Sequence, residues 1–244
     1  MKMRCLAVLL GAFLPVTARG PAPVEAADTG TASVSGRISF EGTVPAPEKI
    51  PVATDAFCQA LHPQGIERRV FEVQEGGLAH VLVYVKSGLS AIYPAPTEPA
   101  VIDQQGCAYV PLVVVVQVGQ PLKIRNSDKT FHNVHTWSIV NPAFNIAQPR
   151  QGMEAIRTFE KLEILFPVRC DIHSWMRAFI AVLPHPFHSV TGPDGTFTIK
   201  GLPAGEYEIE AVHEKLKALT GKVTVRDGEA AKLDLGFKGP QAEM

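Results

Sequence analysis

The sequence predicts an all-β protein, because apolar and polar side chains alternate along many short segments and turn residues separate these segments. Gly and Pro each occur 20 times in a chain of 244 residues, which suits a fold with many tight turns. No segment shows the period of an amphipathic helix, and no long repeat occurs. Many short strands at regular spacing favour sandwiches or barrels.

The first three quarters of the chain contain strands separated by proline-rich connections. These connections lie at 44–58 and 93–100, and a loop is expected at 144–152. Strands are predicted at 32–42, 78–88, twice within 107–128, at 157–170 and at 177–184.

The pattern changes near residue 188. Tight turns at 193–195 and 202–205 then separate strands with strict alternation, as Phe197 and Ile199 illustrate. We therefore divide the chain by range into a leader (1–26), an N-terminal β region with proline-rich loops (27–100), a β-sandwich domain (101–187), a small β module (188–238) and a tail (239–244).

The N-terminus has the pattern of a secretory signal peptide. Lys2 and Arg4 precede an apolar run at 5–16, and small residues near Ala26 offer a cleavage site. This run is too short to span a bilayer, and no later run suits a membrane helix, so we expect no membrane span. The protein is then expected in the periplasm or outside the cell. A net charge of −1 gives no reason to expect a nucleic-acid partner.

Removal of the leader would leave three cysteines, Cys58, Cys107 and Cys170. Export implies an oxidising compartment, where thiols tend to pair, and an odd number leaves one unpaired. The simplest assignment is a Cys58–Cys107 disulfide with Cys170 kept as a thiolate. The alternative pairs Cys170 with one of the other two.

Cys170, His173 and Met176 lie within seven residues, and His132 and His135 lie upstream. Zinc prefers four closed ligands, which the two upstream histidines, Cys170 and His173 could supply while Met176 stays unused. Copper in an electron-transfer site prefers two His, one Cys thiolate and a weak axial Met. His132, Cys170, His173 and Met176 form that set completely, so copper is the favoured metal. A chain that binds no metal is the remaining alternative.

The segments "NSDKTFHNVHTW" (126–137) and "CDIHSWM" (170–176) resemble the cupredoxin family of blue copper proteins, in the amicyanin and plastocyanin-like pattern. The resemblance covers about residues 105–184 and implies a Greek-key β-sandwich with a type 1 copper. Phe131 stands where the family tends to have Pro, and Pro167 and Arg169 change the segment before the ligand Cys.

The resemblance implies copper ligands at His132, Cys170, His173 and Met176. Three further residues would lie outside this set. Asn133 would stiffen the ligand loop through a hydrogen bond, and His135 would not ligate. Trp175 would form either an apolar rim at an imidazole edge or part of the core.

The segment 190–214 resembles carboxypeptidase regulatory-like domains, which are small transthyretin-like sandwiches. The strand at 32–42 has a similar pattern, and either adds to that module or begins a region of its own. No catalytic motif accompanies this resemblance.

These features together predict an exported electron carrier that is not an enzyme and that docks transiently on a redox partner protein. Two other functions remain open. One is a copper-binding accessory or delivery protein of the cell envelope. The other is a structural or carbohydrate-binding β protein with a degenerate metal site.

Overall fold

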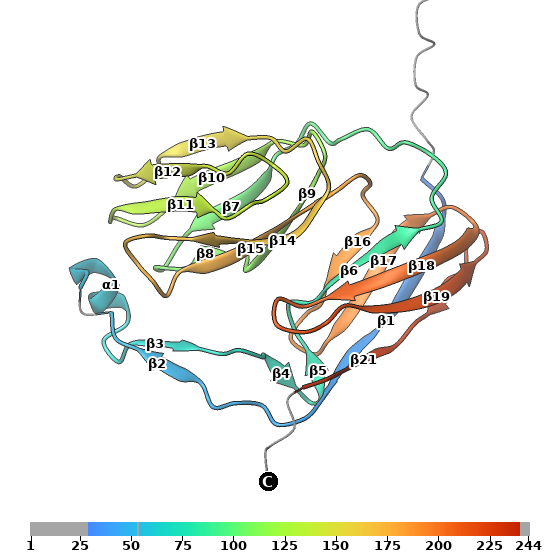
Figure 1. Ribbon diagram of the computed structural model, residues 1–244, viewed down its shortest axis with the longest axis horizontal. Helices are drawn as coiled ribbons and strands as arrows, with labels where there is room; N and C mark the ends of the chain where they lie inside the picture. The colour runs from blue at the N-terminus through green and yellow to red at the C-terminus, as the bar shows by residue number, and fades with distance from the viewer. Residues whose placement is uncertain (1–28, 53, 240–244) are drawn as a thin grey trace, which may run out of the picture.

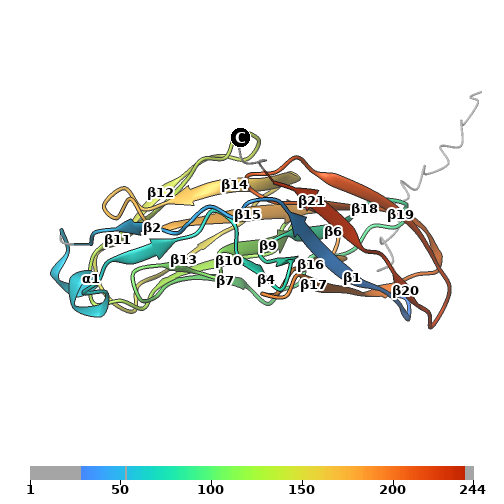
Figure 2. The same ribbon diagram turned by 90° about the horizontal axis from the view of Figure 1, so that it is seen from below.

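The computed structural model describes residues 29–52 and 54–239, and within these residues the all-β prediction is confirmed. One short helix, α1 (Ala56–Leu61), accompanies the strands of this part of the chain. The predicted signal peptide lies outside the described residues, as do residues 240–244 of the tail. The strands form two sandwiches that lie next to each other along the long axis of the molecule (Figures 1 and 2). No helix among the described residues is both long enough and apolar enough to cross a bilayer.

The first sandwich packs two sheets around one apolar core that includes Ile102, Ile124 and Val134. One sheet has the order β13 (Glu154–Arg157), β10 (Leu122–Asn126), β7 (Ala100–Gln104) and β8 (Tyr109–Val110). The other has the order β12 (Asn145–Gln148), β11 (His132–Thr136), β14 (Glu163–Arg169), β15 (Arg177–Leu183) and β9 (Val113–Gln117).

Strand β15 is buried on both faces, because it lies between the two sandwiches. Ala178, Ile180 and Val182 point into the first core, whereas Ala181 and Leu183 join a small cluster with Leu82 and Tyr84 of the second sandwich. The period of two along a strand thus divides the side chains of β15 between two apolar environments. Such a strand has a nearly continuous apolar sequence, as "RAFIAVL" does.

The second sandwich also has two sheets. The first has the order β17 (Thr196–Leu202), β1 (Ala32–Glu41), β5 (Gly77–Leu78) and β4 (Val73–Gln74), with β20 (Ala230–Lys232) and β21 (Leu235–Lys238) also paired to β1. The second has the order β16 (His188–Val190), β6 (Leu82–Ser87), β18 (Gly205–Val212) and β19 (Leu219–Val225).

The second sandwich joins segments from both ends of the described chain. Val34 of β1 pairs with Ile199 of β17, and Phe40 pairs with Phe237 of β21. Strand β6 likewise pairs with β16 and β18. Strand pairing therefore crosses the sequence-based ranges 27–100 and 188–238, and β1 adds to the C-terminal strands. The transthyretin-like character of this sandwich stays a prediction.

An arm leaves the second sandwich after β1 and returns before β4. It consists of β2 (Glu48–Ile50), α1 and β3 (Ile66–Arg68), and Figure 1 shows α1 at the far end of the first sandwich. Asp55 caps the helix by accepting a hydrogen bond from the Cys58 N–H. The sequence indicated only a proline-rich connection here.

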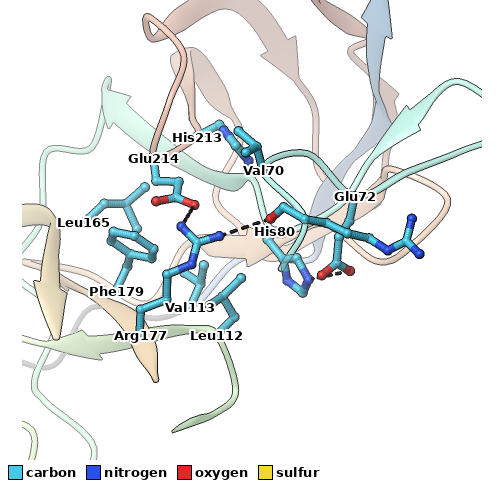
Figure 3. Close-up of a pocket in the computed structure, with 11 residues that line it drawn as sticks. Val70, Glu72, His80, Leu112, Val113, Leu165, Arg177, Phe179, His213 and Glu214 are labelled. Carbon is cyan, nitrogen blue, oxygen red and sulfur yellow. Dashed lines mark hydrogen bonds and ion pairs between the residues drawn. The ribbon is translucent and has the colours of Figure 1, made fainter. Parts of the chain in front are cut away.

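The two sandwiches meet at a polar junction around Arg177, the first residue of β15, which Figure 3 shows facing Glu214. Arg177 forms an ion pair with Glu214, which follows β18, and donates a hydrogen bond to the carbonyl of Arg69. His80 pairs with Glu72 beside them, with 3.0 Å between Nε2 and Oε2. The first residue of β15 after the ligand loop is thus tied to the second sandwich.

Candidate metal centre

The candidate ligands lie where three strands of one sheet end. His132 is the first residue of β11, and Cys170 directly follows β14. These strands are antiparallel neighbours in which His135 pairs with Arg169, so the start of β11 lies beside the end of β14. His173 and Met176 lie in the loop between β14 and β15.

His132, Cys170 and His173 converge in a buried cluster. The Nδ1 atoms of His132 and His173 are 2.9 Å apart, and Cys170 Sγ is 3.7 Å from His173 Nδ1. Both imidazoles have an exposed fraction of 0%, and the thiol residue is 3% exposed. Two nitrogen donors and one sulfur donor therefore face one another out of contact with water.

Backbone hydrogen bonds close the loop that carries the other ligands. The Met176 N–H donates to the His173 carbonyl at 2.9 Å, and the Cys170 N–H donates to the Met176 carbonyl at 3.3 Å. Met176 is 1% exposed and belongs to the core of the first sandwich. The hydrogen bond between Cys170 and Met176 therefore joins the two ends of the loop where it leaves β14 and enters β15.

The charge state of the cluster follows from its hydrogen bonds. Burial alone would raise the pKa of the Cys170 thiol, but its interactions with His132 and His173 outweigh burial and lower it to about 6. Burial lowers the pKa of His132, yet Asp128 and Cys170 more than offset this and raise it above its ordinary value. Both shifts favour the charged forms, a thiolate at Cys170 and a protonated imidazole at His132.

Asp128 supports His132 and was not anticipated from the sequence. Its Oδ2 lies 3.0 Å from His132 Nε2 and accepts the Cys107 N–H, while its Oδ1 accepts the Gly106 N–H. Gly106 and Cys107 have left-handed backbones, with φ of 64° and 58°, which allow consecutive N–H groups to face one carboxylate. Burial raises the pKa of Asp128, but His132 and the two N–H groups hold it below its ordinary value.

Asn133 connects the ligand loop to β11. Its Oδ1 lies 3.3 Å from Cys170 Sγ and accepts a hydrogen bond from the Asp171 N–H at 2.8 Å. Its Nδ2 donates to the Asp171 carboxylate and to Asn145. Asn133 therefore connects β11 to the residue that follows Cys170, and its role at a metal centre stays a prediction.

His135 lies outside the cluster. Its Nδ1 is 3.0 Å from Asp171 Oδ1, and its side chain is 34% exposed. The Asp171 carboxylate has a lowered pKa, chiefly because of this contact with His135. The zinc set that needs His135 is therefore not brought together. Of the copper set, His132, Cys170 and His173 meet in the cluster, and Met176 lies on the same loop as Cys170 and His173.

Trp175 packs inside the first sandwich rather than forming an exposed rim. It is 8% exposed, its ring centre is 4.9 Å from that of His173, and its Nε1–H donates to the Cys107 carbonyl. Cys107 in turn forms a disulfide with Cys58, and Cys170 is the free cysteine of the described chain.

The donor set fits copper. A cysteine sulfur and two imidazole nitrogens meet here, the buried Met176 lies on the same loop as Cys170, and burial keeps water away from these residues. The side chains that sequence reasoning missed are the carboxylates behind the imidazoles, Asp128 and Asp55. Asp128 stands four residues before His132, which was an available signal, whereas Asp55 lies in a distant segment without one.

No family model matches the chain, and no curated protein matches it. Among solved structures, a purple cupredoxin from Nitrosopumilus maritimus is 21% identical over 34% of this chain and 98% of that chain, with a TM-score of 0.30. A mutant of amicyanin in the Cu(I) form is 21% identical over 41% of this chain and 97% of that one, with a TM-score of 0.31. A copper-containing nitrite reductase from Thermus scotoductus is 23% identical over 41% of this chain but only 25% of that one, with a TM-score of 0.31.

Proposed function

We propose that this protein is a type 1 copper protein that carries single electrons between partner proteins in the periplasm or outside the cell. The observation that carries the proposal is the convergence of His132 Nδ1, His173 Nδ1 and Cys170 Sγ in one buried cluster. Met176 completes the ligands on the same loop. Copper in such a set supplies a centre that alternates between Cu(I) and Cu(II).

The residues of this chain would hold the metal in a rigid frame. His132 begins β11, and Cys170 directly follows β14. Because these two strands are paired, the sheet determines the separation of the two residues. Asn133 bonds to both Cys170 and Asp171 and restrains the loop. A restrained, buried donor set needs little rearrangement when the oxidation state changes, which supports fast electron exchange.

Burial also favours electron transfer over copper delivery. A delivery protein has to surrender its metal to an acceptor, which requires access to the ligands. Here both histidines are fully buried and Cys170 is 3% exposed. An electron can cross a few ångströms of protein without any such opening. We propose no enzymatic activity for the centre, and a weak, transient protein complex for the exchange.

The export proposal has independent chemical support. The described chain contains a Cys58–Cys107 disulfide, and such bonds persist in oxidising compartments. The leader-like pattern at residues 1–26 points to the same compartment.

The visible absorption spectrum after addition of Cu(II) tests the proposal. We expect one copper per chain and an intense thiolate-to-copper band in the wild-type protein. Cys170→Ser should lose this band, because the sulfur donor is gone. His135→Ala should keep it, because His135 faces Asp171 instead of the cluster. A wild-type protein without the band would contradict the proposal.

A further inference from the structure

The arm of residues 48–68 reaches the candidate metal centre from the other sandwich. Within the described chain, β2 and β3 pair with each other and not with either sandwich. Val52 and Cys58 are nevertheless buried in the first core, and the disulfide to Cys107 joins the arm to that sandwich covalently. The middle of the arm is therefore fixed beside the candidate ligands, although its two ends connect to β1 and β4 of the second sandwich.

Each candidate histidine ligand has a carboxylate behind it. The two Nδ1 atoms face each other, so the Nε2 atoms point outward. His132 Nε2 meets Asp128 Oδ2 at 3.0 Å, and His173 Nε2 meets Asp55 Oδ2 at 3.4 Å. His173 Nε2 is buried and has no hydrogen-bond partner among the described residues, so Asp55 is the charged group placed to receive its hydrogen.

The disulfide cysteines orient both carboxylates. The Cys58 N–H donates to Asp55 Oδ1 at 2.8 Å, and the Cys107 N–H donates to Asp128 Oδ2 at 2.8 Å. Thr130 donates a further hydrogen bond to Asp55 Oδ2 at 2.6 Å. One covalent bond thus links the two backbone segments that hold the two carboxylates.

We propose that Asp55 is a positioning residue for His173, that the Cys58–Cys107 disulfide keeps it in place, and that the arm thereby lowers the reduction potential of the centre. This inference rests on the proposed copper function. A carboxylate that accepts the Nε2 hydrogen leaves the Nδ1 lone pair free for the metal and makes the imidazole a stronger donor. Stronger donation and a nearby negative charge both favour Cu(II) over Cu(I).

Asp55→Asn is the variant that separates this role from a structural one. Asn caps helices as well as Asp does, so α1 and the Cys58 contact should persist. We expect the Cu(I)/Cu(II) ratio at a fixed ambient potential to rise about tenfold, an upward shift of about 59 mV. Glu67→Gln removes a charge from the same arm, but Glu67 pairs with Arg69, so this control should leave the potential unchanged.

The disulfide is tested with a double variant, Cys58→Ser with Cys107→Ser. We expect an upward shift in potential, and we expect Asp55→Asn to add little in this background, because both changes remove the same contact. Full additivity of the two shifts would overturn the role of the disulfide.

A second measurement uses the metal-free protein. Nitrogen-15 NMR of the imidazoles should show His173 with a hydrogen on Nε2 that exchanges slowly with water in the wild type and faster in Asp55→Asn. Unchanged exchange together with an unchanged potential would overturn the inference while the thiolate-to-copper band still supports the proposed function. Absence of the band in the wild type would instead defeat the proposed function itself.

Discussion

Glu163, at the start of β14, accepts hydrogen bonds from a single loop. The donors are the Ser138 hydroxyl, the backbone N–H groups of Ile139, Val140 and Asn141, and the Asn141 side-chain amide. Burial raises the pKa of the Glu163 carboxyl, but these donors outweigh burial and lower it to about 2, from 4.5. The ionised carboxylate is thus the form that holds the loop.

We expect Glu163→Gln to reduce the free energy of unfolding by about 2 kcal/mol at pH 7, because an amide satisfies fewer of these donors. The folded-state pKa is depressed, so this contribution is complete above pH 4.5 and is lost as pH falls toward 2. Denaturant unfolding of both proteins at pH 7 and pH 3 checks this. A difference that stays constant between the two pH values would contradict it.

The candidate ligands could be proposed from the sequence because most of them are close together in the chain. Cys170, His173 and Met176 occupy one loop, and the spacing alone places three donors together. Asp55 was not predictable, because its contact with His173 depends on the path of an arm from the other sandwich. Sequence spacing carries information over a few residues, whereas this contact depends on the tertiary fold.

The loop between β11 and β12 begins at the end of β11 opposite His132, and it presents apolar side chains to solvent. Trp137 is 57% exposed, and Ile139 is 94% exposed. The Trp137 ring centre lies 5.6 Å from that of His135, which pairs with Asp171, the neighbour of Cys170. The exposed Trp137 ring is thus linked to the ligand loop through His135 and Asp171, and an exposed apolar ring is suited to weak docking of a redox partner.

We expect Trp137→Ala to slow electron self-exchange between the Cu(I) and Cu(II) proteins about tenfold, because the two copies lose apolar contact area. NMR line broadening in mixtures of the two forms measures this rate. Ile156→Ala provides the control, since Ile156 is 48% exposed on β13 of the other sheet. Equal rates for wild type and Trp137→Ala would exclude this face from docking.

The strands were easier to predict than the helix. Alternation marks β17 and β18 clearly, with Phe197 and Ile199 buried on one side. Helix α1 has six residues, which is too short for an apolar period to emerge. The Asp55 cap and the Cys58 disulfide stabilise this helix instead. Neither feature produces a repeating pattern of apolar residues from which a helix could be predicted.

The two sandwiches are joined at the junction where Arg177 forms an ion pair with Glu214 and donates a hydrogen bond to the Arg69 carbonyl (Figure 3). Side chains of this ion pair are only 17% and 10% exposed. Removing one partner of a mostly buried pair leaves the other charge without compensation. The junction should therefore couple the stability of the two sandwiches.

We expect Glu214→Gln to lower the free energy of unfolding by about 2 kcal/mol, because Arg177 then stays buried without its partner. Denaturant unfolding followed by circular dichroism measures the change. Lys232 and Asp234 form an exposed ion pair in the second sandwich, so Asp234→Asn is a control that should change stability by less than about 1 kcal/mol. Equal effects of the two substitutions would contradict this role of the junction.

The overall arrangement was only partly predictable. The two-sandwich composition follows from strand patterns, but β1 pairs with strands near the other end of the chain. Such pairings depend on contacts between residues far apart in sequence, which no local pattern records. A prediction that divides the chain into continuous ranges therefore could not place β1 and β6 in the same sandwich as β16–β21.

The position of the disulfide also bears on how the chain matures. Cys58 and Cys107 both precede Cys170 in the chain. During synthesis from the N-terminus, these two cysteines therefore emerge from the ribosome before Cys170 does. The bond can then close without competition from Cys170. Strand β1 has to wait longer for its partners, because β17, β20 and β21 all follow the first sandwich in the chain. Order of synthesis would thus complete the first sandwich, which holds the candidate metal centre, before the second, and would protect Cys170 from mispairing.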